Sequence, residues 1–396
     1  MNKNIFIYLS IFLVVVTCGI LLMKSVGNNS INGVDTMEVS QDSEDTSTSV
    51  DWDNNGMFSK YYTLANNKLN TLTLDEKIGQ LFLVRYPESN QTSLLKQYNF
   101  AGYIFYEDDF TDKTKYEVVK MMEELQEAAK IPILTAVDEE GGDVVRVSSN
   151  PNLVNSKFLS PSELYKEGGF DVIKLDTVNK SKILYDLGLN LNLAPVVDVA
   201  TDSNSYIYNR TLQQNTELTS TYANTVIEAS KNSGVSYVLK HFPGYGNNAD
   251  THLGTATDTR SYDDIKDNDL PPFKAGIEAG GESILVSHNI VTAIDDVNPA
   301  SLSSSVHKLL RNDLGFTGIT IADDLGMDAL DNYQNPAVKA ILAGNDLVIV
   351  TDFQNSIEEV KEAVNDGTIS EDTINNLAKR VIAWKYYKGL MYENQK

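Results

Sequence analysis

The sequence has a single cysteine, Cys18, and few basic side chains for its length of 396 residues. One cysteine cannot form a disulfide within the chain, so no disulfide framework supports the folded part. The 32 Lys and Arg residues are outnumbered by 55 Asp and Glu residues, and the formal net charge is −23. Broad binding to nucleic acid or to anionic lipid headgroups needs clustered Lys and Arg, so this balance argues against both partners.

Histidines are also scarce. No group of Cys and His residues has the spacing of metal ligands, so we expect no catalytic metal and no other cofactor. His307 falls within a helical pattern and is predicted to lie at the surface. The other three, His241, His252 and His288, lie at or near the ends of apolar runs.

Only residues 5–23 form a long, nearly continuous apolar run, which lies between two lysines. Such a run indicates an export signal or a single membrane-spanning helix. Nineteen residues is long for a cleaved signal and just enough for a span, so residues 1–24 are predicted to be a membrane anchor. Cys18 follows Val-Val-Thr, which loosely resembles a lipoprotein processing site. Lipidation at Cys18 and a cleaved signal therefore remain alternatives.

Residues 25–57 are rich in Asn, Ser, Thr and Asp and have almost no apolar clustering. This composition predicts a disordered acidic linker. Because the linker carries no basic cluster, we expect it and the following domain, residues 58–396, to lie on the extracellular face of the cell membrane.

From residue 72 onward, short apolar runs alternate with segments of helical periodicity, such as residues 116–129, 219–230 and 306–314. This alternation is the signature of a parallel α/β fold. The eight runs are residues 79–86, 101–106, 131–138, 189–199, 235–241, 283–288, 318–323 and 346–352. Eight strands of this kind predict a single (β/α)8 TIM-type barrel. We expect a monomer.

Charged or titratable residues stand at the carboxyl ends of six of the eight runs. They are Asp138, Asp198, Lys240 with His241, His288, Asp323 and Asp352. In a barrel of parallel strands these ends converge on one rim, where the chemistry of such enzymes lies. A single polar residue there could be a structural cap, but the repetition predicts a site.

The most informative stretch is residues 235–254, VSYVLKHFPGYGNNADTHLG. An apolar strand ends in Lys240 and His241, and a Gly-rich turn then leads to Asp250 and His252. A carboxylate beside an imidazole fixes its tautomer and stabilises its charged form, which suits proton transfer. The alternative is that these two polar residues only cap the loop.

This stretch resembles the signature of the family 3 glycoside hydrolases, in the branch that contains bacterial β-N-acetylglucosaminidases. The pattern there reads KHFPGHG followed by DSH. Here Tyr245 replaces a histidine and Thr251 replaces a serine. Residues 137–147, VDEEGGDVVRV, resemble a second family segment, DQEGG-RVQR, with Asp143 and Val145 in place of Arg and Gln. The resemblance covers about residues 70–352.

The resemblance implies a two-step retaining mechanism, which needs a nucleophile and an acid/base group. Asp323, directly after the apolar residues ITIA, matches the family's nucleophile. Asp324 is a competitor, but adjacent residues of a strand face opposite ways, so only one is expected to point into the barrel mouth. The resemblance gives the acid/base role to His252, paired with Asp250, in place of a second carboxylate.

The resemblance also implies which residues hold the sugar: Asp138, Arg146, Arg210, Lys240 and His241. Charge-assisted hydrogen bonds from such groups orient a neutral polyol. For Asp198 and His288 a supporting role is at least as well favoured as substrate contact. The family histidine at position 245 lies close to the sugar, so Tyr245→His is expected to change the Michaelis constant more than the turnover number.

The implied activity is that of an exo-β-N-acetylglucosaminidase, acting on oligosaccharides or glycoconjugates with terminal N-acetylglucosamine, such as cell-wall or chitin-type fragments. One alternative is a family 3 β-glucosidase, although those relatives usually take their acid from a second domain, which this chain is expected to lack. The other is a catalytically silent, membrane-tethered sugar-binding protein, which the changes at positions 143, 145 and 245 suggest. Either water or phosphate could be the acceptor.

Overall fold

The computed structural model describes residues 55–246 and 248–393. The predicted anchor and most of the predicted linker lie outside these residues, and none of the helices within them has the length and apolar character to cross a membrane. Met57, the last residue of the predicted linker, donates its backbone N–H to Thr317 Oγ1 at 3.1 Å and packs against the core. The packed part of the chain therefore begins before residue 58.

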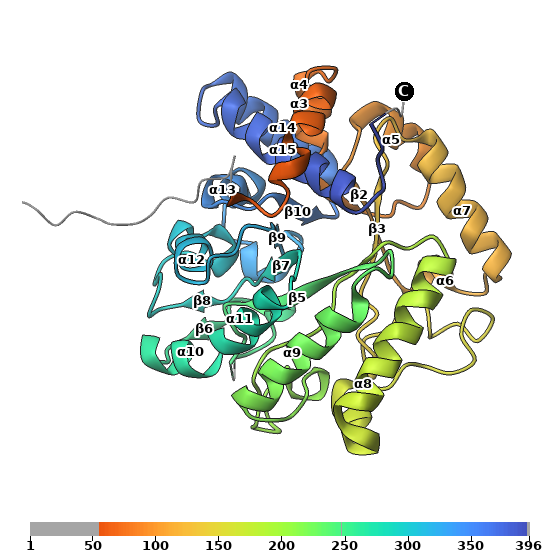
Figure 1. Cartoon of the computed structure of the whole chain (residues 1–396). Coiled ribbons are helices and arrows are strands. Elements are labelled where there is room, and N and C mark those ends of the chain that lie inside the picture. The colour runs from red at the N-terminus through yellow and green to blue at the C-terminus, as the bar shows by residue number, and fades with distance from the viewer. Residues whose placement is uncertain (1–54, 247, 394–396) are drawn as a thin grey trace, which may run out of the picture. The chain divides into compact units, whose positions relative to one another are not determined.

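Eight parallel strands close into a barrel, as the alternating apolar runs predict (Figure 1). Around the barrel they are β1 (Phe82–Arg85), β2 (Gly102–Phe105), β3 (Leu134–Val137), β4 (Leu191–Asn192), β5 (Ser236–Phe242), β7 (Ser283–Val286), β9 (Ile319–Ala322) and β10 (Leu347–Val350), which pairs again with β1. Every strand lies within one of the predicted runs or extends it by one residue. The fold is a (β/α)8 TIM-type barrel.

Strand β4 is much shorter than the predicted run, residues 189–199. Pro195 has no N–H to donate, so the regular ladder stops at Asn192. Strand β5 still donates to this segment, because the N–H groups of Val238 and Lys240 bond to the carbonyls of Ala194 and Pro195. The run is thus extended and buried, although only its first part is a regular strand.

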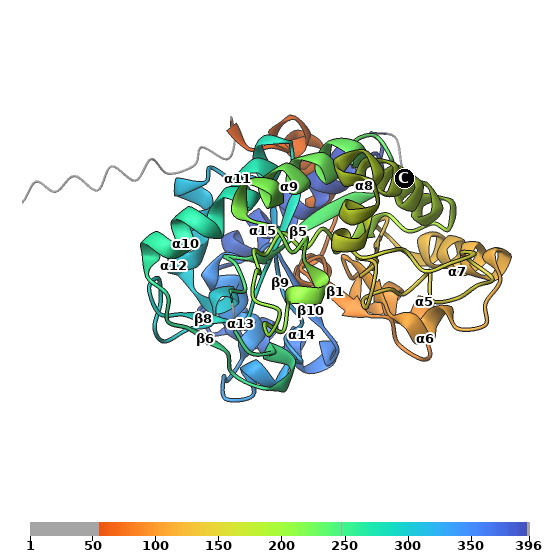
Figure 2. The same ribbon diagram turned by 90° about the horizontal axis from the view of Figure 1, so that it is seen from below.

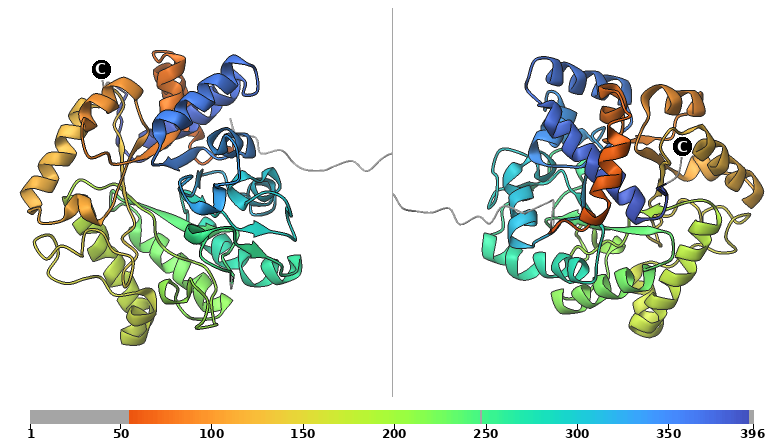
Figure 3. Two further views of the ribbon diagram at one scale, coloured as in Figure 1. Left: turned by 180° about the vertical axis from the view of Figure 1, so that it is seen from behind. Right: turned by 45° about the horizontal axis from the view of Figure 1, so that its top comes forward.

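Helices surround the barrel (Figures 1 and 3). They are α3 (Tyr62–Leu69), α4 (Leu74–Gly79), α5 (Gln91–Tyr98), α6 (Glu107–Phe110), α7 (Lys115–Ala128), α8 (Pro161–Asp186), α9 (Thr216–Ser230), α10 (Tyr262–Asn268), α11 (Leu270–Glu278), α12 (Ser304–Lys308), α13 (Pro336–Ala343), α14 (Phe353–Asn365) and α15 (Glu371–Tyr387). Their starts follow local chemistry: the side chains of Thr73, Thr114 and Ser160 each cap a helix in a capping box.

The first and last helices of the described chain lie side by side (Figure 3). Two rings just before α3, Phe58 and Tyr61, pack edge-on against Tyr387 at the end of α15, with centroids 5.2 and 6.1 Å apart. Trp384, also in α15, is fully buried in the core. This packing joins the two ends of the domain on the barrel wall.

Short elements lie at the carboxyl ends of the strands. Helix α6 directly follows β2, and a two-stranded sheet of β6 (Thr257–Asp258) and β8 (Ile290–Val291) is built from the segments after β5 and β7. In Figure 2 these elements lie toward the lower end of the barrel. The rim that the sequence predicts to carry the site is therefore surrounded by short, irregular elements.

The predicted surface position of His307 is wrong. His307 is only 4% exposed, its Nδ1 lies 2.9 Å from the carbonyl oxygen of Ser303, and its ring packs on Gly344. Helix α12 has five residues and continues into a π-helical turn, Leu309–Asp313, so the simple helical period does not say which face is buried. Burial lowers the pKa of His307.

Candidate active site

A cavity of about 470 Å³ lies at the carboxyl ends of the barrel strands. The five predicted sugar-binding residues, Asp138, Arg146, Arg210, Lys240 and His241, all line it, as do His252, Asp323 and Asp324. Apolar side chains that include Ile104, Leu193, Leu285 and Ile349 line it as well. The structure thus gathers residues from segments far apart in the sequence around one concave site.

A second cavity, of about 570 Å³, lies by the amino ends of β5 and β7. Lys388 Nζ donates to Ser236 Oγ there, and the Ser236 hydroxyl donates to Glu282. Lys388, Ser236 and Glu282 thus act as hydrogen-bond partners for one another. Residues at the amino ends of barrel strands serve stability rather than catalysis. The smaller cavity, at the carboxyl ends, is therefore the candidate active site.

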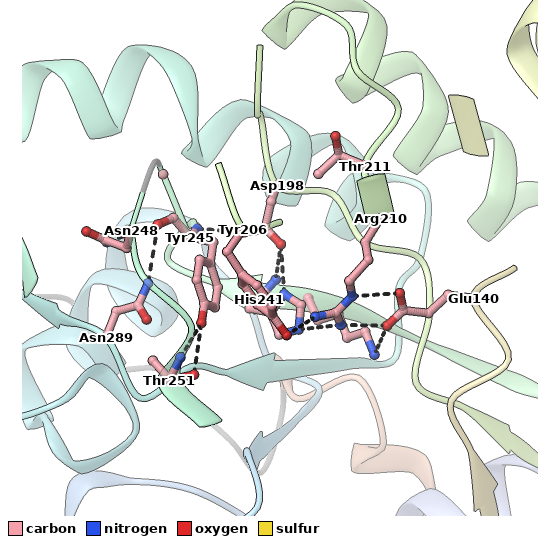
Figure 4. Close-up of polar contacts among 12 residues, drawn as sticks. Glu140, Asp198, Tyr206, Arg210, Thr211, His241, Tyr245, Asn248, Thr251 and Asn289 are labelled. Carbon is pink, nitrogen blue, oxygen red and sulfur yellow. Dashed lines mark hydrogen bonds and ion pairs between the residues drawn. The ribbon is translucent and has the colours of Figure 1, made fainter. Parts of the chain in front are cut away.

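The buried carboxylate of Glu140 organises one wall of the site (Figure 4). Its Oε1 accepts from Arg210 Nη2 at 2.7 Å and lies 2.6 Å from Lys240 Nζ, and its Oε2 accepts from Arg210 Nε at 3.0 Å. Lys240 Nζ also donates to Asp138 Oδ1 at 2.6 Å. Burial alone would raise the pKa of Glu140, but Arg210 and Lys240 outweigh it, so the pKa lies well below its usual range.

His241 lines the cavity and joins Arg210 to Asp198 (Figure 4). The carboxylate of Asp198 accepts from the backbone N–H of His241 at 3.1 Å and lies 2.8 Å from its Nδ1. A carboxylate only accepts, so the ring proton is assigned to Nδ1, and Nε2 accepts from Arg210 Nη2 at 3.2 Å. Asp198 is 1% exposed and does not line the cavity. It orients His241 rather than facing the substrate.

Glu139 folds the turn that carries Arg146. Its Oε2 accepts from the backbone N–H groups of Arg146 and Val147 at 2.8 and 2.6 Å, and its Oε1 accepts from Ser148 Oγ at 2.5 Å. The Arg146 guanidinium lies 5.6 Å from the centre of the Tyr106 ring, and its buried Nε has no partner within the described chain. A buried donor without a partner costs free energy unless a ligand binds it.

Asp323 and Asp324 both line the cavity, so the expectation that only one would face it is wrong. Strand β9 ends at Ala322, and the alternation of a strand no longer applies to the two residues that follow. Asp324 is tied into its loop: Oδ1 accepts from the backbone N–H of Gly326 at 2.9 Å, and Oδ2 accepts from Tyr106 Oη at 3.4 Å. Asp323 accepts one hydrogen bond among the described residues, from the N–H of Asp324 at 3.0 Å.

The two carboxyls differ in their electrostatic surroundings. Burial would raise the pKa of Asp323, but the imidazoles of His288 and His241 and the backbone N–H of Asp324 outweigh it, and the pKa is lowered. Burial, together with the negative charge of Asp323, raises the pKa of Asp324. Asp323 is therefore the better ionised and less constrained carboxylate, as a nucleophile must be.

His288 lies behind these carboxyls. It is fully buried, with Nε2 2.9 Å from the carbonyl oxygen of Asp324 and Nδ1 2.7 Å from Ser301 Oγ. A carbonyl only accepts, so Nε2 carries the ring proton. Burial lowers the pKa of His288, and its ring fixes the backbone after β9. Asp352, by contrast, caps helix α14 through Asn355 and does not line the cavity.

Asp250 and His252 form the expected pair on the loop after β5. His252 Nδ1 lies 2.7 Å from Asp250 Oδ1, which also accepts from the backbone N–H of His252 at 2.9 Å. The His252 side chain lines the cavity but is 58% exposed. The contact with Asp250 assigns the ring proton to Nδ1, so Nε2 is left to exchange a proton at the cavity.

Tyr245 is placed differently from what the resemblance implies. It is 2% exposed and does not line the cavity. Its ring lies edge-on to His241, with centroids 5.6 Å apart, and its hydroxyl points toward Thr251 (Figure 4). Tyr245 is therefore a neighbour of the sugar-binding network and not a wall of the cavity.

Sequence reasoning missed two residues of the site, Glu140 and Tyr206. Glu140 stands two residues after Asp138 in the EEGG segment, and this position on the family-like turn was the available signal. Tyr206 lines the cavity, accepts from Arg210 Nη1 at 3.4 Å, and lies with its ring 6.5 Å from that of His252. It sits in an irregular segment with no pattern that would mark it.

Known proteins resemble this chain over most of its described length. The family model described as glycosyl hydrolase family 3 N terminal domain matches residues 73–384. The β-hexosaminidase of Xanthomonas campestris pv. campestris (strain B100) is 30% identical over 292 residues, which cover 72% of this chain and 87% of that protein. The β-hexosaminidase of Nitrosomonas eutropha is 34% identical over 241 residues, covering 58% and 68%.

Among solved structures, a glycoside hydrolase family 3 β-N-acetylglucosaminidase from Paenibacillus sp. str. FPU-7 is similar, with a TM-score of 0.75 at 26% identity. The likeness covers 81% of this chain but 63% of that one, so this chain spans less than two thirds of its length. These relatives come from the branch whose signature residues 235–254 resemble. The chain therefore belongs to glycosyl hydrolase family 3.

Proposed function

We propose that the protein is a retaining exo-β-N-acetylglucosaminidase that removes terminal, β-linked N-acetylhexosamine from oligosaccharides or glycoconjugates. One observation carries this proposal: the ionised carboxylate of Asp323 and the Asp250-paired imidazole of His252 line the same cavity. The names of the similar proteins, β-hexosaminidase and β-N-acetylglucosaminidase, support the choice of sugar.

In the first step the Asp323 carboxylate attacks the anomeric carbon, and the bond to the leaving oxygen breaks. His252 Nε2 delivers a proton to that oxygen, so the leaving group departs as a neutral alcohol. The charge on Asp250 beside Nδ1 stabilises the protonated ring before this transfer. The product of the step is a sugar bound covalently to Asp323.

In the second step neutral His252 takes a proton from water, and the oxygen of that water attacks the anomeric carbon. Asp323 leaves as a carboxylate, and the sugar keeps its β configuration after two inversions. The exposure of the His252 side chain fits this role, because the group must exchange protons with solvent in each cycle.

The wall built on Glu140 holds the sugar. Lys240, Arg210 and Arg146 supply donors, while Asp138 supplies an acceptor, and all four line the cavity. The salt bridges of Arg210 with Glu140 and of Lys240 with Asp138 fix these groups before substrate binds, so little of their side-chain entropy is lost on binding.

Hydrolysis of a chromogenic aryl N-acetyl-β-glucosaminide beside the matching aryl β-glucoside tests the proposal. Preference for the N-acetyl sugar supports it. Preference for the glucoside would favour a family 3 β-glucosidase, and binding of sugar without turnover of either would favour a silent sugar-binding protein.

Water is the proposed acceptor in the second step. Product analysis in phosphate and in phosphate-free buffer tests this choice. Free N-acetylglucosamine in both buffers is expected, whereas a sugar 1-phosphate formed only in phosphate buffer would make the enzyme a phosphorylase.

We also propose that the domain works at the extracellular face of the cell membrane, held by residues 1–24, on cell-wall or chitin-type fragments. The support is the apolar run, residues 5–23, followed by an acidic segment without basic clusters. Mass spectrometry of the mature amino terminus tests it. An intact Met1 or Asn2 supports the helical anchor, a diacylated Cys18 replaces it by a lipid anchor, and a start near Ser25 in the medium would contradict both.

A further inference from the structure

The hydroxyl of Tyr245 makes two contacts with one residue, Thr251 (Figure 4). Tyr245 Oη lies 2.9 Å from Thr251 Oγ1 and accepts from the backbone N–H of Thr251 at 2.9 Å. Both side chains are buried, with Tyr245 2% and Thr251 1% exposed. Water therefore does not compete for these hydrogen bonds, and breaking them would leave buried polar groups without partners.

The backbone of Tyr245 is fixed as firmly as its side chain. Its N–H donates to Asp198 Oδ1 at 2.6 Å, and Asp198 also orients His241. Its carbonyl oxygen accepts from Asn248 Nδ2 at 3.0 Å and from Asn289 Nδ2 at 3.3 Å. Tyr245 is thus fixed beside the sugar-binding network, although it does not line the cavity.

Thr251 stands between Asp250 and His252 in the sequence, and these two neighbours are far less constrained by packing. The exposed fractions of the Asp250 and His252 side chains are 20% and 58%. The hydrogen bond between them fixes their mutual orientation, and Tyr206, which lines the cavity, also contacts Asp250. The buried residue between them attaches this short segment to Tyr245.

We infer that Tyr245 and Thr251 form a hydroxyl clasp that positions the Asp250–His252 pair for proton transfer. Tyr245 and Thr251 are positioning residues, because their hydroxyls contact each other and not the cavity. This inference rests on the proposed acid/base role of His252. Without the clasp, the segment at residues 250–252 would spend more time away from the leaving oxygen, while the sugar-binding wall would be unchanged.

Tyr245→Phe tests the clasp, because it removes the hydroxyl and keeps the ring. We expect the turnover of N-acetylglucosaminides with poor alkyl leaving groups to fall about tenfold or more, since general acid catalysis contributes about 10²- to 10⁴-fold. Activated dinitrophenyl glycosides, which need little protonation, should lose less than about threefold. Loss of folded protein would lower the turnover of both kinds of substrate equally, and a damaged sugar site would raise the Michaelis constant, which should stay unchanged here.

Thr251→Val should show the same leaving-group dependence, and Thr251→Ser, which keeps a hydroxyl, should restore activity. The Tyr245→Phe/Thr251→Val double variant should lose about as much as either single variant, because one clasp is removed in each case. Tyr208→Phe is a matched control: Tyr208 packs against the same small apolar cluster as Tyr245, and its hydroxyl bonds to no described residue. It should behave as the parent enzyme.

His252→Ala separates failure of the clasp from failure of the proposed function. If His252→Ala shows strong leaving-group dependence and Tyr245→Phe shows none, His252 is the acid/base group and the clasp is wrong. If His252→Ala itself shows no leaving-group dependence, the proposed acid/base assignment is wrong and the clasp falls with it. Strict additivity of Tyr245→Phe and Thr251→Val would also overturn the clasp.

Discussion

The site joins two regions whose charged groups differ in how deeply they are buried. In the wall built on Glu140, the carboxylate is 1% exposed and both cations that contact it are largely buried. In the loop after β5, the His252 side chain is 58% exposed beside Asp250. Burial strengthens ion pairs and fixes their geometry, which suits groups that only orient a sugar.

A group that gives up a proton and regains it in every cycle has a different requirement. It must meet solvent, and it must reach the leaving oxygen in one step and a water molecule in the next. Exposure on a loop meets this requirement, but it removes the packing that would hold the group in place. The comparison predicts that variants in the wall change binding and stability, while variants in the loop change proton transfer.

Asp323 lies in the cavity that both regions line, and its loss should have the largest effect. Asp323→Ala should lower turnover by several orders of magnitude on every substrate, because covalent catalysis is lost. Asp324→Asn should cost much less, since Asp324 is already engaged by Gly326 and Tyr106. Trapping with a fluorinated substrate analogue, followed by peptide mass spectrometry, checks the assignment, and an adduct on Asp324 would contradict it.

His252→Ala should have the next largest effect, and a selective one. Turnover of substrates with poor leaving groups should fall about 10²- to 10⁴-fold, while activated aryl glycosides should be affected far less. Asp250→Ala should act in the same direction more weakly, and the double variant should be non-additive, because the two residues act as one unit. Kinetics over a leaving-group series measures this, and an equal loss on all substrates would place His252 in binding instead.

Glu140→Gln should affect substrate binding and stability, in contrast to the loop variants, which affect proton transfer. It removes the charge that Arg210 and Lys240 share and leaves two buried cations with one fewer partner. We expect a raised Michaelis constant for all leaving groups and a loss of about 3 kcal/mol in the free energy of unfolding. Denaturant unfolding checks the second effect, with Asp250→Asn, at the less buried ion pair, as the control. Equal stability losses for the two variants would break the comparison.

The fold was predictable because a barrel strand that is buried on both faces is a run of aliphatic residues, and six of the eight such runs end in a charged or titratable residue. The predictions that were wrong concern places where the regular repeat of a strand or helix is interrupted. Pro195 ends the β4 ladder, the π-helical turn after Lys308 displaces the helical face of His307, and the end of β9 frees Asp324 to face the cavity.

The site was predictable as a set of residues but not as a set of contacts. The motifs predicted that Asp138, Arg210 and Lys240 belong to one site. Only the structure shows that the Glu140 carboxylate contacts both cations, Arg210 and Lys240. Likewise, the sequence shows that positions 245 and 251 both depart from the family-like signature. Only the fold shows that these two departures touch each other.

The smallest effect we predict is that of Tyr245→His. This change restores the histidine of the family signature while residue 251 is still threonine and not the signature's serine. An imidazole ends closer to its own Cα than a phenol hydroxyl does, so it should not reach both groups of Thr251. Because Tyr245 does not line the cavity, the Michaelis constant should hold and the turnover of poor substrates should fall by no more than about tenfold, or about 1.4 kcal/mol. This reverses the expectation from the resemblance alone.

The exchange of both residues, Tyr245→His with Thr251→Ser, should recover part of the loss, since the signature pairs those two side chains. A tenfold gain in turnover for Tyr245→His alone would show that the tyrosine impairs the enzyme, and the loop would then not depend on the clasp.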